Sequence, residues 1–171
     1  MPMGSSTQRS FRWRREWLGS STGPSWYIRR HGPLQFFFKK HEGFRDTVYL
    51  DSLGKATIGY GHLLTEDDDF EEGIQYDKSL LENLFDKDFN RSAYNAEQLL
   101  EGIDICDAAR EIIVEMVFQL GIGGVSKFKK MFEALRKKDY NEAAEQMLDS
   151  QWRVQTPKRC EELSDLMRSC A

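Results

Sequence analysis

The sequence lacks the features that would place it in a membrane or around a metal. No apolar run approaches the roughly 20 residues that a membrane helix needs, and residues 1–33 lack the apolar core of a secretory signal. We therefore predict neither a transmembrane segment nor a signal peptide. Histidine is scarce as well, and His31, His41 and His62 do not complete a zinc-ligand pattern, so we expect no metal and no cofactor.

Cysteine is also scarce. Cys106, Cys160 and Cys170 are an odd set without metal-ligand spacing. Cys160 and Cys170 recur with Leu163 and Met167 on one apolar helical stripe, which predicts buried free thiols. A disulfide framework is therefore not expected, and the chain is predicted to mature in a reducing compartment.

Charge is abundant but unevenly distributed. Residues 1–40 hold eight Lys and Arg against one acid, whereas the remaining 131 residues hold 16 basic and 27 acidic side chains. We predict that residues 1–33 form a flexible basic extension on an acidic globular domain, residues 34–171. The stretch "RSFRWRREW" also suits nucleic-acid or membrane-surface contact. We expect a solvated tail instead, and no nucleic-acid partner.

The hydrophobic pattern predicts an α+β fold. Pro33 favours a helix over 34–42, and two alternating stretches around Gly54 predict a β-hairpin. An acidic loop follows at 65–73, and the helical period then continues to the end of the chain. This predicts a sheet lobe over about 44–75, a linking helix over about 77–101, and a helical lobe over about 104–170 together with helix 34–42. Within that lobe we expect one helix over 104–120 that ends at "GIGG", and a second that begins at a cap at Ser126. A third should run from Asp139 through Met147, and a fourth should begin at Thr156-Pro157.

Two carboxyl groups near the hairpin suit glycosidic-bond hydrolysis, which needs one protonated acid and one ionised base. Glu42 lies at a helix end beside apolar neighbours, which should raise its pKa and suit it to proton donation. Asp51, at the rim of the hairpin, should stay ionised, and Thr57 could hold a water molecule against it. Spacing alone is weak evidence, because most paired acids are surface charges.

His62 is predicted to have a structural role. It precedes Leu63-Leu64, which indicates that it points inward, and Asp88 falls on the apolar stripe of the long helix. A buried acid needs a partner, and a histidine provides one. We predict an ion pair between His62 and Asp88 that links the hairpin to the helix; metal ligation and catalysis are the less favoured readings.

Three blocks in this chain carry a family resemblance. "EGFRDTVYLDSLGKATIGYGHLLT" (42–65) holds a Glu-x8-Asp-x5-Thr spacing, and "MVFQLGIGGVSKF" (116–128) and "YNEAAEQMLDSQWRVQTPKR" (140–159) follow in order. Together they resemble the phage-type lysozymes of glycoside hydrolase family 24, over about residues 34–170. The resemblance implies a lysozyme-like fold with an active-site cleft between the lobes. It implies Glu42 as general acid, Asp51 as base and Thr57 as the water-positioning residue.

The resemblance also implies the reaction. The chain is expected to be a muramidase that hydrolyses the β-1,4 bond between N-acetylmuramic acid and N-acetylglucosamine of bacterial peptidoglycan. Inversion would place the carboxyl groups about 6.5–9.5 Å apart. The resemblance implies Phe118 and Gln119 as saccharide contacts, and Thr156 is placed at the border of the cleft. The alternative is a catalytically weak peptidoglycan-binding protein.

The biological setting stays open at this point. We expect a monomer. A phage-encoded enzyme would wait in the host cytoplasm for holin-type release, whereas a eukaryotic defence protein would act outside the cell.

Overall fold

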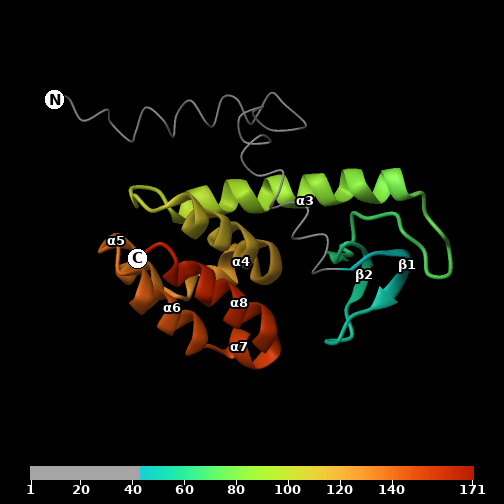
Figure 1. Ribbon diagram of the computed structural model, residues 1–171. Helices are drawn as coiled ribbons and strands as arrows, with labels where there is room; N and C mark the ends of the chain where they lie inside the picture. Colours follow the sequence, from blue (N-terminus) through green and yellow to red (C-terminus); the bar gives the residue numbers. More distant parts are fainter. Residues whose placement is uncertain (1–42) are drawn as a thin grey trace, which may run out of the picture. The chain divides into compact units, whose positions relative to one another are not determined.

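The computed structural model describes residues 43–171. The predicted helix 34–42, Glu42 and the basic extension lie outside the described residues. The described chain divides into two compact units, residues 43–91 and residues 92–171, and the boundary falls inside the long helix α3 (Figure 1). The α+β class predicted from the sequence is confirmed, whereas the cleft between two lobes stays a prediction.

The first unit is built on a three-stranded antiparallel sheet with strand order β1-β2-β3. Its first two strands form the predicted hairpin, joined by a tight turn in which Gly54 has a φ of +75°. A glycine is favoured there because a side chain in the left-handed region is strained. The strands are β1 (Arg45–Leu50), β2 (Ala56–Gly59) and β3 (His62–Leu63).

Helix α3 (Lys78–Leu99) follows the acidic loop and corresponds to the linking helix predicted over about 77–101. Its first turns pack against the sheet of the same unit. Gly59, with a φ of +66°, lies against the helix: a Cβ atom there would be in ordinary contact with the Cβ of Leu81, at 3.5 Å. The Tyr60 ring meets the Phe85 ring edge-on, at a centroid distance of 5.3 Å. The sheet is therefore held on α3 by aromatic packing and by the contact at Gly59.

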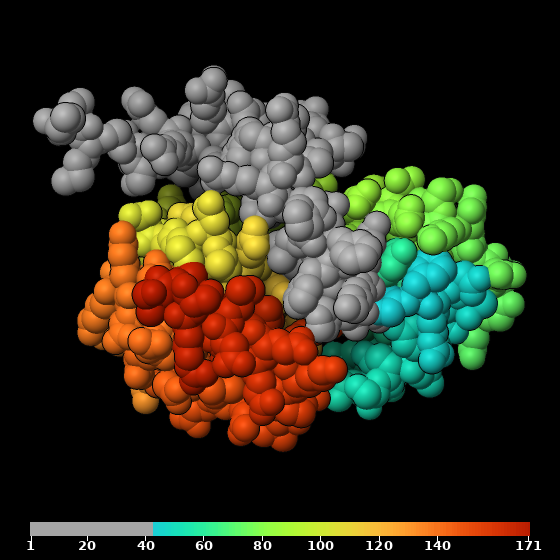
Figure 2. Space-filling view, viewed as in Figure 1, coloured from blue at the N-terminus to red at the C-terminus, as the bar shows by residue number. Residues whose placement is uncertain are grey.

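The second unit is helical. Helix α6 packs against both α5 and α8, and the helices from α5 onward form one closely packed surface, coloured orange to red in Figure 2. Its core is apolar and includes the fully buried side chains of Met131, Leu135, Met147 and Leu163. None of the helices in residues 43–171 is long and apolar enough to cross a membrane. The helices are α4 (Asp107–Ser126), α5 (Lys129–Arg136), α6 (Tyr140–Leu148), α7 (Gln151–Gln155) and α8 (Pro157–Arg168).

Several helix ends differ from the sequence prediction. Gly121 breaks the helical geometry of α4 with a φ of +74°, but the helix resumes and runs to Ser126. Ser126 is therefore not an N-cap: α5 begins at Lys129, after Phe128, which provides no side-chain cap. The short helix α7 was not predicted. Asp139 does cap α6, as predicted, since its side chain accepts a hydrogen bond from the Glu142 N–H.

The prediction that the chain has no disulfide is wrong. Cys106 and Cys170 are bonded, with their Cα atoms 6.4 Å apart and a sequence separation of 64. Cys106 is the N-cap of α4, and Cys170 lies just beyond the end of α8, so it is not a buried member of the helical stripe. Cys160 is a buried free thiol, as predicted. The apolar spacing from Cys160 to Cys170 indicates which side chains share a helix face. It does not indicate that Cys106, at the start of α4, lies next to Cys170.

Candidate active site

Asp51 organises the hairpin turn. It follows β1, and its Oδ1 accepts hydrogen bonds from the backbone N–H groups of Leu53 and Lys55, both at 2.8 Å. Its own carbonyl accepts from the Gly54 N–H at 2.9 Å. An aspartate at the start of a turn favours this arrangement because its short side chain reaches the N–H groups that follow. No partner of Oδ2 is seen among the described residues, so that oxygen is available to a water molecule.

Thr57 is linked to Asp51 through the main chain of Lys55. The Thr57 hydroxyl donates to the Lys55 carbonyl oxygen at 3.0 Å, and the same oxygen accepts from the Asp51 N–H at 2.9 Å. Thr57 pairs with Tyr49 across the hairpin, and Asp51 lies two residues beyond Tyr49. Asp51 lies just beyond the end of β1, so the main chain of Lys55 is what links it to Thr57.

Glu42 lies outside the described residues. The structure therefore brings together two members of the predicted catalytic set, Asp51 and Thr57, and does not test the third. The described chain begins immediately after Glu42, at Gly43, which has a φ of +68°.

His62 contacts two carboxylates. Its Nδ1 lies 2.6 Å from Asp88 Oδ2, and its Nε2 lies 3.1 Å from Asp68 Oδ2. The contact with Asp88 was predicted, but the contact with Asp68, which belongs to the acidic loop, was missed. Asp68 also accepts from the Thr65 N–H at 2.8 Å and from the Thr65 hydroxyl at 2.9 Å. The histidine therefore connects the sheet, the acidic loop and α3 within the first unit.

These contacts favour the charged form of His62. The hydrogen bond with Asp88 is the largest cause that raises the pKa of the imidazole; burial opposes it, and the charges of Asp88 and Asp68 reinforce it. For Asp68, burial alone would raise the pKa, but the Thr65 N–H, the imidazole and the Thr65 hydroxyl outweigh it and lower the pKa. Both shifts favour the protonated imidazole, in which each ring N–H can donate to one of the two carboxylates.

The raised pKa of His62 predicts how stability depends on pH. A group whose pKa rises on folding stabilises the folded state below its unfolded pKa, near 6.5 for histidine, and this contribution is lost as pH rises through the folded pKa. We expect Asp88→Asn to lower the free energy of unfolding by about 1.5–3 kcal/mol near pH 6, with a smaller loss at higher pH. Urea unfolding at several pH values measures this. A loss that stayed constant over that range would show that the pair contributes no charge interaction.

The second unit holds the three residues predicted to contact saccharide. Gln119 accepts a hydrogen bond from Trp152 Nε1 at 3.0 Å through its Oε1, and its Nε2 donates to Thr156 Oγ1 at 3.3 Å. Thr156 Oγ1 in turn donates to the Trp152 carbonyl at 3.2 Å. Gln119 and Thr156 therefore fix α4 to the junction of α7 and α8, and one N–H of the Gln119 amide stays available. Phe118 directly precedes Gln119 on α4 and is half-buried.

A buried ion pair in the same unit was missed by the sequence prediction. Glu115 on α4 is 1% exposed, and its Oε1 lies 3.8 Å from Arg159 Nε on α8. A signal was present: Glu115 stands among the apolar residues 112–114, 116 and 117 of the predicted helix, where a charged side chain needs a partner. Glu115 and Gln119 are four residues apart, so these two polar side chains lie on the same side of α4.

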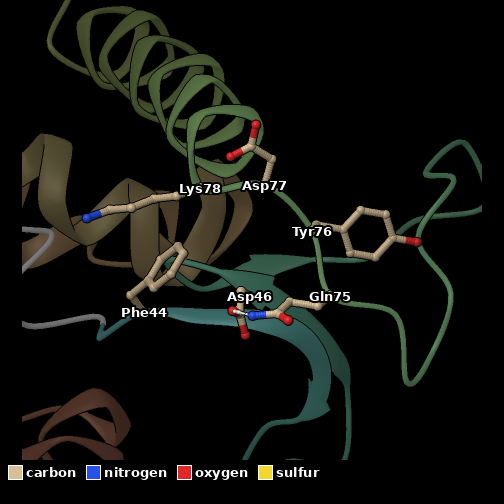
Figure 3. Close-up of a pocket in the computed structure, with 6 residues that line it drawn as sticks. All are labelled: Phe44, Asp46, Gln75, Tyr76, Asp77 and Lys78. Atoms are coloured by element: carbon tan, nitrogen blue, oxygen red, sulfur yellow. Dashed lines mark hydrogen bonds between the residues drawn. The ribbon is translucent and has the colours of Figure 1, made fainter.

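An open pocket of about 420 Å³ lies beside the start of α3. Gln75 Nε2 donates to Asp46 Oδ2 at its floor, at 2.5 Å. Tyr76 and Asp77 point away from Phe44 (Figure 3), so the polar groups do not converge on one point, and we assign the pocket no role. Its lining residues are Phe44, Asp46, Gln75, Tyr76, Asp77 and Lys78.

Comparison with known proteins identifies the class. The profile of the family described as "Phage lysozyme" matches residues 39–168. "Probable T4-type lysozyme 2" of Dictyostelium discoideum is 34% identical over 149 aligned positions, which cover 74% of this chain and 88% of that protein. "Probable T4-type lysozyme 1" of the same organism is 29% identical over 151 positions, which cover 74% of this chain and 88% of that protein. The "Pre-baseplate central spike protein Gp5" of Enterobacteria phage T4 is 28% identical over 144 positions, 71% of this chain and 25% of that protein.

The chain therefore belongs to the phage lysozyme family, as its motifs predicted. It is a glycoside hydrolase of the lysozyme type, in a family that acts on peptidoglycan.

Proposed function

We propose that this protein is a muramidase that cleaves the β-1,4 bond between N-acetylmuramic acid and N-acetylglucosamine with inversion at the anomeric carbon. One observation carries the proposal: the turn that holds Asp51 also fixes Thr57, because the Lys55 main chain bonds to both. A base and a water-positioning hydroxyl need such a rigid mutual geometry. The family membership supplies the substrate class.

The proposed reaction divides the work among three side chains. Glu42 donates its proton to the glycosidic oxygen as the bond to the anomeric carbon breaks. Asp51 takes a proton from the water that attacks that carbon from the opposite face. The Thr57 hydroxyl proton is already directed to the Lys55 carbonyl, so Thr57 would accept a hydrogen bond from this water rather than donate one.

Saccharide contact in the second unit is proposed for Phe118, Gln119 and Thr156. The hydrogen bonds of Gln119 hold its amide in one orientation, which leaves the second Nε2 proton for a sugar hydroxyl or acetamido oxygen. Phe118 is half-buried, and we propose that its ring contributes apolar contact to a sugar face. An amide fixed by Trp152 and Thr156 loses little conformational freedom when substrate binds.

The disulfide favours action outside a reducing cytoplasm, since such bonds persist in oxidising compartments. We therefore propose that the folded enzyme meets its substrate in an oxidising space and acts there as a monomer on bacterial peptidoglycan. This replaces the reducing compartment predicted from the cysteine pattern.

The assignment of the acid is tested by Glu42→Gln. Loss of turbidity of outer-membrane-permeabilised bacteria should be slower by a factor of about 10²–10⁴, the usual contribution of a general acid. Glu66→Gln, in the exposed acidic loop, is the matched control and should lyse like the wild type. Equal lysis by Glu42→Gln and the wild type would remove Glu42 from the mechanism. Wild-type protein that bound peptidoglycan but released no reducing ends would instead be a binding protein.

A further inference from the structure

The positive charge of the described chain is concentrated on one short segment. Residues 127–138, which contain α5, hold six of the 16 basic side chains of residues 43–171 but only one of the 26 acidic ones. The remaining described residues therefore carry 10 basic and 25 acidic side chains. This contrast makes the α5 segment a cationic region among described residues that are otherwise strongly acidic.

Four of these cations form no ion pair within residues 43–171. Lys137 meets Glu133 at 3.6 Å and Lys138 meets Asp104 at 3.0 Å, so these two are partly neutralised. The other four side chains are exposed. We refer to them as the α5 cationic face: Lys127, Lys129, Lys130 and Arg136.

The helix holds this face rigidly. Met131 and Leu135 of α5 are fully buried, and Phe132 is 6% exposed, so the apolar side of the helix is fixed in the core of its unit. Lys129 and Arg136 are seven residues apart and Lys130 lies beside them, which places all three on the opposite side. The outward orientation of the cations is therefore set by the burial of the apolar side.

We propose that the α5 cationic face, none of whose residues belongs to the proposed catalytic set, binds the stem-peptide carboxylates of peptidoglycan. The inference rests on the proposed function, because that function supplies a polymer with repeated carboxylates. Three of the four cations are lysines. A lysine carries a compact charge that suits a flexible polyanion, whereas the fork of an arginine suits a single planar group held in a fixed orientation. The acidic remainder of the described residues is repelled by the same polymer, so the face also selects the side from which the protein approaches.

The test compares two variants of equal charge. Lys129→Gln/Lys130→Gln/Arg136→Gln removes three cations from the face. Lys87→Gln/Arg91→Gln/Lys158→Gln removes two lysines and one arginine that are also exposed and form no ion pair among the described residues. Binding to insoluble peptidoglycan, purified free of phosphate-bearing wall polymers, is measured by co-sedimentation over a range of NaCl concentrations.

We expect the α5 variant to bind about tenfold more weakly than wild type at low salt and to lose much of the salt dependence, because fewer charge contacts form. The control variant should bind within about twofold of wild type. Amidation of the stem carboxylates should abolish the difference between wild type and the α5 variant. Equal binding by the two triple variants would overturn the proposal, as would a difference that persists after amidation or that appears only with phosphate-bearing wall polymers.

Two further readouts keep this result separate from the proposed function. Hydrolysis of peptidoglycan by wild type tests the muramidase assignment alone, whichever variant binds better. The rate on a short uncharged glycan should be unchanged in the α5 variant, since none of the substituted residues belongs to the proposed catalytic or saccharide-contact set. A lowered rate on that glycan would show that the substitutions damage the enzyme and would contradict the assignment of these residues to polymer binding.

Discussion

Asp51→Asn should lower the rate of peptidoglycan hydrolysis by a factor of about 10²–10⁴ while leaving the fold intact. Asparagine keeps an Oδ1 that can accept from the Leu53 and Lys55 N–H groups at the start of the same turn. It cannot take a proton from the attacking water. The substitution therefore separates the chemical role of the carboxylate from its structural one, and turbidity loss measures the first.

Two variants complete this experiment. Asp51→Ala removes the acceptor of two backbone N–H groups, so it should lose activity and also about 1 kcal/mol of unfolding free energy. Asp67→Asn changes an exposed acid of the loop and should behave like the wild type. If Asp51→Asn kept most of the wild-type rate, Asp51 would be a turn residue only, and the base would have to be found elsewhere.

Removing the disulfide should produce the largest loss of stability. Closing a loop between residues 64 apart restricts the unfolded chain, and disulfides of this kind typically contribute about 2–4 kcal/mol. The bond joins the N-cap of α4 to the residues after α8, so it holds both ends of the helical unit together. We expect reductant to lower the midpoint of thermal unfolding by roughly 5–15 °C.

The matched variant is Cys106→Ser/Cys170→Ser. A serine at position 106 can still accept the Ala109 N–H, as the Cys106 sulfur does at 3.3 Å, so the N-cap is retained. This variant should unfold at the lower midpoint whether or not reductant is present. A wild-type midpoint that did not respond to reductant would show that the bond contributes nothing to stability.

Local patterns sufficed for much of the fold and part of the candidate site. Gly54 between two alternating stretches predicted the hairpin, because few other residues adopt the left-handed turn conformation. Asp88 on an apolar stripe predicted a partner, and His62 provides it. The hairpin was predictable because its turn is set by residues close in sequence. The His62–Asp88 pair was predictable because a buried, unpaired acid would cost too much free energy.

Interactions between distant segments were not predictable in this way. The Cys106–Cys170 bond depends on where α8 ends relative to the start of α4, which no periodicity encodes. The second carboxylate on His62 comes from Asp68, whose loop resembled an ordinary solvated acidic run. Gly121 was read as a helix stop, but the packing of Val125, fully buried, favours one more helical turn beyond it. Tertiary burial decides such positions.

The products released from peptidoglycan test the central claim most directly. Wild-type enzyme is incubated with purified peptidoglycan, and the earliest products are examined by mass spectrometry for the reducing sugar and by proton NMR for its anomeric configuration. An inverting muramidase acting on a β-1,4 bond must release N-acetylmuramic acid as the reducing end, initially as the α-anomer. Reducing N-acetylglucosamine, an initial β-anomer, or no reducing ends would contradict the proposed reaction.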